Sequence, residues 1–137
     1  MKRFNVVVMA LALGCASLAQ AETALVVNPV NKDTIGLEDA ERLFLGKVKA
    51  FPSGAAATPL NQAEASPARE AFDAAVLKKS ASQLKAYWSK LIFTGKGNPP
   101  AEMDAAGVKA KVAGDPTAIG YIDASEVDGS VREVARF

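Results

Sequence analysis

The chain has 137 residues, of which 16 are basic and 15 acidic, and half of the residues are hydrophobic. Because basic and acidic residues are interspersed, the sequence does not predict the basic face that nucleic-acid binding needs. It contains no histidine and one cysteine, so the usual general base, the commonest metal ligand and any disulfide are missing. We therefore expect neither an enzyme nor a metal-binding protein, and we expect no cofactor.

The N-terminal residues predict a secretory signal peptide. Two basic residues precede an apolar run from Val6 to Leu13, and Ala19-Gln20-Ala21 is a small-x-small cleavage motif. We expect residues 1–21 to be removed on export to the periplasm. Residues 22–137 would then form one domain, with 14 basic and 15 acidic residues and a net charge of about −1.

Two strands and a helix are predicted in the first half of the domain. Ala24 to Val27 is a short apolar run ended by Asn28-Pro29, which is typical of a buried strand entering a loop. Apolar residues then recur at helical spacing, with acidic residues in the first turn, where the helix dipole favours them. The apolar positions of this helix are Leu37, Ala40, Leu43 and Phe44. Residues 47–57 indicate a connection, and Thr58 to Asn61 is the second predicted strand.

Two helices are predicted in the middle of the chain. Ser66 followed by Pro67 is a typical helix start, and apolar spacing continues that helix to Leu77. Ser80 and Gln83 have the S-x-x-Q spacing of a capping box, which begins a second helix. The apolar face of this second helix consists of Leu84, Tyr87, Trp88, Leu91 and Ile92. We expect that face to pack on the core of the domain.

The last third of the chain predicts a weaker helix and two further strands. Met103 to Val112 has helical spacing that Gly107 interrupts. Ala118 to Ile122 is β-branched and aromatic, and Gly120 within it permits close approach of a neighbouring element. Ser130 to Val134 is the last predicted strand. Strands that alternate with helices indicate an α/β fold with a small sheet flanked by helices.

The strongest candidate for a binding site is the start of the helix that follows Ser66. The Ser66 hydroxyl, the backbone N–H groups of Ala68 and Arg69, and the Arg69 guanidinium would converge on one oxyanion. A cation in the first turn of a helix opposes the helix dipole, so a bound anion would offset that cost. The alternative is that Arg69 forms a surface ion pair with Asp73 or Glu70.

The basic loop from Gly95 to Pro100 is a second candidate. Gly95 ends the capped helix, Lys96 adds an ammonium group, and Pro99-Pro100 prevents the helix from restarting. Lys96 would contact an anion or a partner, and the alternative is a solvated lysine. The acidic residues lack calcium-loop spacing, so the sequence predicts no metal site.

Five motifs follow one another in an informative order. They are V-V-N-P (Val26–Pro29), L-F-L-G-K (Leu43–Lys47), S-P-A-R-E-A-F (Ser66–Phe72), the tract Ser80–Pro100, and A-I-G-Y-I (Ala118–Ile122). Together they resemble the periplasmic phosphate-binding proteins of ABC transporters, and more closely the short exported members of that superfamily. The resemblance covers roughly residues 25–122. It implies one lobe of a type II periplasmic binding-protein fold, with a mixed sheet, where full-length members have two lobes.

The resemblance also implies a function in solute uptake. The chain would be an exported solute-binding-like protein for an ABC-type system, with phosphate or a similar oxyanion as ligand and a membrane transporter or sensor as partner. The stretch from Asn61 to Ala68 departs from the family's arginine and Gly-Ser-Gly-Thr pattern, because Pro67 lacks an N–H and Glu64 would repel phosphate.

The first lobe of the family has no counterpart in this sequence. A single lobe cannot bury an anion between two walls, so a second copy of the chain or another protein would have to complete the site. The alternative function is an envelope interaction or sensor-accessory module that binds no ligand.

Overall fold

The computed structural model describes residues 22–137, so the predicted signal peptide, residues 1–21, lies outside the described part. The strands are β1 (Thr23–Val27), β2 (Thr58–Gln62), β3 (Ala101–Met103), β4 (Ala118–Asp123) and β5 (Arg132–Arg136). The helices are α1 (Leu37–Phe44), α2 (Pro67–Phe72), α3 (Ala81–Phe93) and α4 (Ala105–Gly114). One turn of π-helix, Asp73–Leu77, extends α2, and a short 3₁₀ turn, Ala124–Glu126, follows β4. No helix in the described residues is long and apolar enough to cross a membrane.

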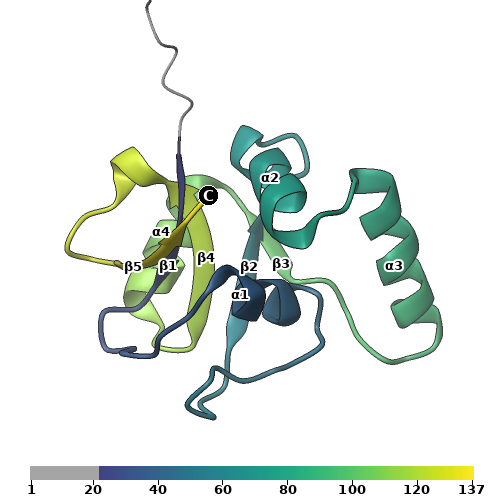
Figure 1. Cartoon of the computed structure of the whole chain (residues 1–137), viewed down its shortest axis with the longest axis horizontal. Coiled ribbons are helices and arrows are strands. Elements are labelled where there is room, and N and C mark those ends of the chain that lie inside the picture. Colours follow the sequence, from purple (N-terminus) through teal and green to yellow (C-terminus); the bar gives the residue numbers. More distant parts are fainter. Residues whose placement is uncertain (1–21) are drawn as a thin grey trace, which may run out of the picture.

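The five strands form one mixed sheet in the order β3-β2-β4-β1-β5 (Figure 1). β2 runs parallel to β3 and β4, whereas β1 is antiparallel to β4 and β5. β1 lies between two strands and is covered on both faces, so all five of its residues are buried. This arrangement confirms the predicted α/β fold with a small mixed sheet.

Each face of the sheet has its own core, because successive strand residues point to opposite sides. On one face, Leu25 and Val27 of β1 pack with α1, α2 and its π-helical extension. On the other face, Ala24 and Val26 pack with α4. Gly120 of β4 lets α4 approach closely, as its sequence position indicated, since an added Cβ there would lie 2.4 Å from Val108 Cγ1.

The predicted helix starts are present. The Ser66 hydroxyl accepts the backbone N–H of Arg69 at 3.4 Å, and Pro67 is the first residue of α2. The capping box of α3 is formed in both directions, with Gln83 N–H donating to the Ser80 hydroxyl and Ser80 N–H donating to the Gln83 side chain. Local sequence therefore determines where both helices begin.

The expectation that α3 packs its whole apolar face on the core is wrong. Leu84 is buried, and Tyr87 donates its hydroxyl to the Leu45 carbonyl oxygen at 2.6 Å. The C-terminal end of the helix projects from the body of the molecule (Figure 1), so Ile92 is 52% exposed and Phe93 is 91% exposed. Periodicity identifies the apolar side of a helix, but it does not say how much of that side a neighbour covers.

A second contact joins α3 to the body. Trp88 is half-buried and its ring lies over Gly46, where an added Cβ would be 3.4 Å from the ring. Gly46 has a φ of +70°, in the left-handed region that favours glycine, and it follows the C-terminal end of α1. The turn after α1 therefore provides a flat surface for the tryptophan.

Several boundaries in the last third differ from the sequence prediction. Asp104 caps α4 by accepting the Gly107 N–H at 2.7 Å, so the helix begins after Asp104. Met103, with which the predicted helix began, is the last residue of β3. β3 has no β-branched or aromatic residue, which is why its composition gave no strand signal. β5 begins later than predicted because Ser130 lies in a turn, where its N–H donates to the Asp128 carboxylate at 2.9 Å.

The contact between Gly120 and α4 yields a stability prediction. In Gly120→Ala the new methyl group would lie 2.4 Å from Val108 Cγ1. Val108 is fully buried, and a β-branched side chain in a helix has little rotamer freedom, so it cannot move aside. We expect the free energy of unfolding to fall by about 1–3 kcal/mol, measured by equilibrium denaturation in urea.

Gly114→Ala is the matched control for this substitution. Nothing lies within 4 Å of an added Cβ at Gly114, so the change should leave stability the same or raise it slightly. An equal loss of stability in both variants would contradict the close approach of α4 to Gly120.

Candidate functional site

The candidate site lies at the edge of the sheet where the parallel strands β2, β3 and β4 end. β2 leads into α2 through residues 63–66, and β3 leads into α4 through Asp104 (Figure 1). α2 packs on one face of the sheet and α4 packs on the other. Ligands of open α/β sheets bind beyond the carboxyl ends of strands, at points where the connections diverge in this way. This edge is therefore where the fold would present a ligand.

A buried polar network fixes the end of β2. The Tyr121 hydroxyl donates to Asn61 Oδ1 and accepts the Gln62 backbone N–H at 3.2 Å. Gln62 Nε2 also donates to the Tyr121 carbonyl oxygen at 2.7 Å. The Tyr121 ring stacks on Phe72 of α2, with ring centroids 4.2 Å apart. Burial raises the pKa of Tyr121 above its ordinary value, so its hydroxyl stays protonated and remains a donor.

The structure places Ser66 and Ala68 at the start of α2, as predicted. The Ser66 hydroxyl caps the helix and donates its own proton to Gln62 Oε1 at 2.7 Å. Ala68 lies in the first turn and packs, half-buried, against the core. The Ser66 proton is therefore already used within the protein.

Arg69 is surrounded by protein acceptors. Its Nε donates to both carboxylate oxygens of Asp73 at 3.1 Å, so the ion pair that the sequence offered as the alternative is formed. Its Nη1 donates to the Gln62 carbonyl oxygen at 2.8 Å and to Glu102 Oε1 at 3.1 Å. The Arg69 and Asp73 side chains are only 11% and 10% exposed, so this pair lies below the surface.

The pKa of Asp73 shows how acidic this corner is. Burial raises the pKa of Asp73 above its ordinary value, and the charge and hydrogen bonds of Arg69 offset only part of that shift. Glu64 and Glu102 raise the pKa further, because each adds negative charge nearby. The Arg69 guanidinium therefore balances the charge of more than one carboxylate.

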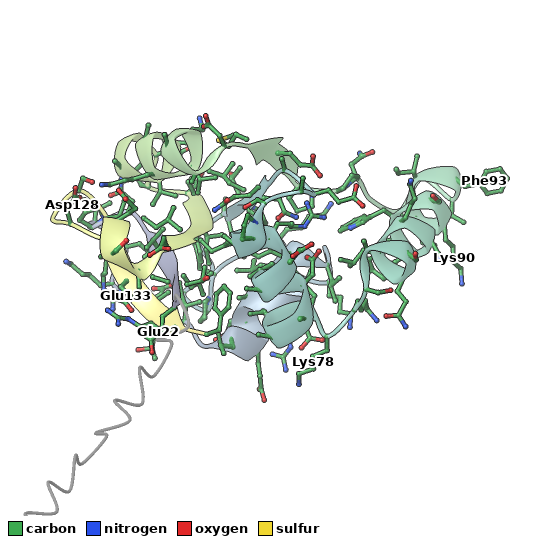
Figure 2. All side chains as sticks on the ribbon, turned by 90° about the horizontal axis from the view of Figure 1, so that it is seen from above. Glu22, Lys78, Lys90, Phe93, Asp128 and Glu133 are labelled. Atoms are coloured by element: carbon green, nitrogen blue, oxygen red, sulfur yellow. The ribbon has the colours of Figure 1, made fainter. Side chains whose placement is uncertain are left out.

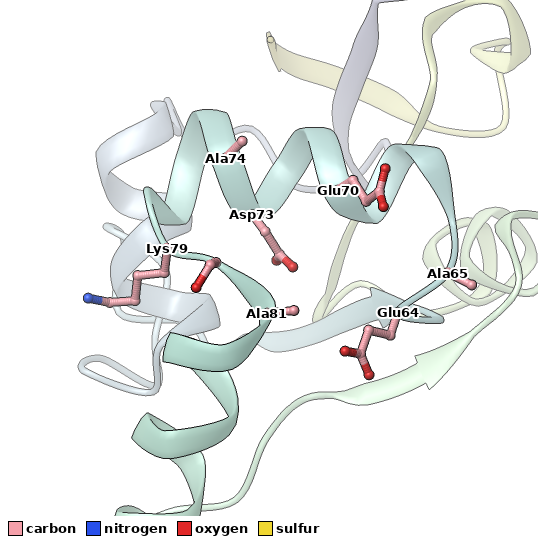
Figure 3. Close-up of a pocket in the computed structure, with 8 residues that line it drawn as sticks. Glu64, Ala65, Glu70, Asp73, Ala74, Lys79 and Ala81 are labelled. Carbon is pink, nitrogen blue, oxygen red and sulfur yellow. The ribbon is translucent and has the colours of Figure 1, made fainter.

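Acidic side chains also line the hollow beside this network. A pocket of about 530 Å³ lies between α2, its π-helical extension and the start of α3. Glu64, Glu70 and Asp73 line it together with Lys79 (Figure 3). A phosphate in this pocket would meet more negative than positive charge. Within residues 22–137, no group of three His, Cys, Asp or Glu side chains is placed to hold a metal ion.

Lys96 lies in a different hollow. That hollow has a volume of about 240 Å³ and is also lined by Trp88 and by the turn after α1. The structure thus brings Ser66, Ala68 and Arg69 together and leaves Lys96 apart from them.

Sequence reasoning missed four residues of the network, namely Asn61, Gln62, Glu102 and Tyr121. Glu102 follows Arg69 by 33 residues, and only the pairing of β2 with β3 brings the two together. Gln62 lies four residues before Ser66, but a glutamine at the end of a strand carries no signal that distinguishes it from a solvated side chain. Tyr121 was recognisable as a strand residue, whereas its hydrogen-bond partners depend on the β2–β4 contact.

Solved structures match this fold, although no protein-family model and no curated protein matches the sequence. An ABC-type phosphate transport receptor from Vibrio cholerae matches with a TM-score of 0.65 and 18% identity, over 83% of this chain and 46% of the receptor. A protein from Clostridium perfringens matches with a TM-score of 0.63 and 23% identity, over 83% of this chain and 45% of that protein. It is assigned as a phosphate ABC transporter substrate-binding protein and was solved with bound phosphate. PstS from Borrelia burgdorferi matches with a TM-score of 0.61 and 16% identity, over 84% of this chain and 47% of PstS.

These likenesses show the fold. The chain has the architecture of one lobe of a periplasmic binding protein, which confirms the fold that the ordered motifs implied. It spans less than half the length of each of these three proteins.

The buried ion pair yields a second stability prediction. In Arg69→Met the charge of Asp73 would remain buried without its partner, so we expect the free energy of unfolding to fall by about 3 kcal/mol. The double variant Arg69→Met/Asp73→Leu removes both charges and should be clearly more stable than Arg69→Met alone. Equilibrium unfolding in guanidinium chloride measures both variants.

Arg136→Met is the control for that experiment. Arg136 is paired with Glu133 and Glu22 on the surface, so its loss should change stability little. If the double variant were no more stable than Arg69→Met, the cost would not come from an uncompensated carboxylate at Asp73.

The buried tyrosine yields a prediction about alkaline pH. Tyr121→Phe should cost about 1 kcal/mol at neutral pH, because Asn61 Oδ1 still accepts the Gln62 N–H. Above pH 10 an unfolded tyrosine ionises, at its ordinary pKa of about 10, whereas buried Tyr121 keeps its proton. The native state then binds more protons than the unfolded state, so this group's contribution to stability falls as the pH rises.

Urea unfolding of the wild type and Tyr121→Phe at several pH values tests this expectation. The difference in stability between the two proteins should shrink as the pH rises above about 10. A difference that stays constant across that range would mean that Tyr121 titrates equally in both states.

Proposed function

We propose that this protein is an exported accessory lobe of the substrate-binding-protein fold, which acts in the periplasm beside a membrane transporter or sensor and does not capture an oxyanion by itself. The single observation that carries the proposal is the set of contacts around Arg69. Asp73 and Glu102 supply carboxylate oxygens to its guanidinium at 3.1 Å. These carboxylates therefore already accept hydrogen bonds from the guanidinium that a bound anion would need.

The other donors at this corner support the same conclusion. The Ser66 hydroxyl donates to Gln62, so binding an anion would require that hydrogen bond to break. Pro67 has no N–H to offer at the first position of α2. Glu64 and Glu70 add negative charge to the adjoining pocket and would repel phosphate.

The open side of the lobe weakens binding further. Ligand sites of high affinity usually bury most of the ligand, and a single lobe provides one wall. The solved structures that share this fold have more than twice the matched length, and one of them was solved with phosphate bound. An oxyanion on the present chain would remain in contact with water and gain little from the few donors left.

Oxyanion binding for an ABC-type uptake system is the second candidate, and one observation favours it. The Glu102 side chain is 54% exposed, so its contact with Arg69 is a weak surface interaction that another anion could displace. Arg69 and Ser66 would then face the ligand. A second copy of the chain, or another protein, would supply the missing wall.

Isothermal titration calorimetry with phosphate, sulfate and acetate separates the two candidates. We expect wild-type protein to bind phosphate no tighter than about 1 mM, which corresponds to roughly −4 kcal/mol. The variant Glu64→Gln/Glu102→Gln removes two repelling charges and replaces the ionic contact of Glu102 with Arg69 Nη1 by a weaker neutral one, so it should bind phosphate measurably more tightly.

Glu126→Gln is the matched control, because it removes an exposed negative charge that does not line the pocket beside Arg69. Micromolar binding of phosphate by the wild type, lost in Arg69→Lys, would establish the second candidate and overturn the first. Arg69→Lys keeps the positive charge beside Asp73 but loses the directed guanidinium donors, so circular dichroism must show that this variant is folded under the conditions of the titration.

A further inference from the structure

The charges of the chain are divided unevenly between α3 and the rest of the fold. Residues 74–101 contain five lysines and no acidic residue, so the interspersed pattern of the sequence fails in this stretch. The remainder of residues 22–137 holds nine basic and fifteen acidic residues, a net charge of −6. The basic stretch contains the helix that projects from the body (Figure 1).

The far end of α3 combines these lysines with exposed apolar side chains. We use the name α3 tip for Lys90, Ile92, Phe93 and Lys96, all of which are exposed. Phe93 is 91% exposed and points away from the molecule, with Lys90 beside it (Figure 2). An aromatic ring held in water at a protruding end of the fold costs free energy, which contact with an apolar medium would recover.

We propose that the α3 tip binds the surface of an anionic lipid bilayer, with Phe93 and Ile92 entering the interfacial region and the lysines contacting the lipid headgroups. Basic segments with exposed aromatic and aliphatic side chains associate with membranes in this way. Each lysine near an anionic leaflet adds attraction, and several together give weak, reversible attachment.

Two features favour a bilayer over an acidic protein partner. All five basic residues of the stretch are lysines, and lysine is depleted in protein–protein interfaces, where arginine is enriched. In addition, Phe93 protrudes, so a protein partner would need a matching pocket, whereas a fluid interface accommodates any shape.

A second copy of the chain does not fit the α3 tip as well. In a two-fold symmetric dimer the same patch meets itself, so the lysines of one α3 tip would face those of the other. Such like-charge contacts are unfavourable, and the two exposed apolar side chains are too few to offset them.

The remaining charges would orient the bound molecule. Glu22, Asp128 and Glu133 lie at the end of the molecule opposite α3 (Figure 2). Arg136 pairs with Glu22 and Glu133, and Lys109 pairs with Asp128, so this end offers little free positive charge to an anionic surface. The lysines of α3 have no acidic neighbour in their stretch of sequence, so the protein would stand on the α3 tip with the sheet directed away from the bilayer. This orientation does not depend on whether Arg69 binds an anion.

Vesicle co-sedimentation tests the proposal on residues 22–137, which contain every strand and helix described here. One set of vesicles contains phosphatidylcholine alone, and the other contains equal parts of phosphatidylcholine and phosphatidylglycerol. We expect binding to the mixed vesicles only, and we expect it to weaken steeply as salt is added.

Variants of the α3 tip separate attraction from insertion. Lys90→Glu/Lys96→Glu should reduce vesicle binding by more than about tenfold, because each reversal replaces attraction by repulsion. Phe93→Ser should reduce it several-fold at unchanged charge. Lys32→Glu and Val30→Ser are matched controls, because both residues are exposed and lie in the loop after β1, and neither should change binding.

Immobilised polyglutamate provides the comparison with an acidic protein. If the protein bound neither kind of vesicle but were retained by polyglutamate, the partner would be an acidic protein and the proposal would be overturned. Equal binding to neutral and mixed vesicles, or mixed-vesicle binding that both α3-tip variants leave unchanged, would overturn it as well.

Discussion

Tyr121 is the residue on which the sheet, α2 and the candidate site all depend. Its ring stacks on Phe72, its hydroxyl donates to Asn61, and its carbonyl oxygen accepts the Gln62 side chain. Gln62 in turn accepts the Ser66 hydroxyl and, through its carbonyl oxygen, Arg69 Nη1. These contacts fix the loop at the end of β2, because every fully buried side-chain nitrogen and oxygen of the network has a hydrogen-bond partner.

That network uses its donors to hold the fold together. Arg69 lies in the first turn of α2, where the helix dipole disfavours a cation, and Asp73 and Glu102 compensate for this position from within the chain. In a binding protein, a bound anion would compensate for the positive charge at the start of the helix. Under the proposed function, internal carboxylates take the place of a ligand on this scaffold, since shared fold does not imply shared function.

Local signals predicted much of this structure, and contacts between distant residues account for what they missed. The caps at Ser66 and Ser80 and the apolar run of β1 were visible in the sequence, because each depends on residues within one turn or strand. The Arg69–Asp73 pair was also foreseen as an alternative, at i,i+4 spacing. Glu102 was not assigned to the site, because its contact with Arg69 exists only once β3 has paired with β2. The exposed end of α3 was missed for a related reason: its periodic pattern is that of a packed helix, and only tertiary structure shows that nothing covers it.

The position of Trp88 has a consequence for optical measurements. It is the only tryptophan in the sequence, and it lies on α3 where the helix meets the turn at Gly46. Fluorescence emission of the protein therefore reports whether α3 is docked, whereas far-ultraviolet circular dichroism reports on the sheet and all the helices together. Because α3 is held to the body at few points, it can detach as a local unit below the global transition. Melting curves recorded by the two methods then describe two different events, and their separation measures the independence of the helix.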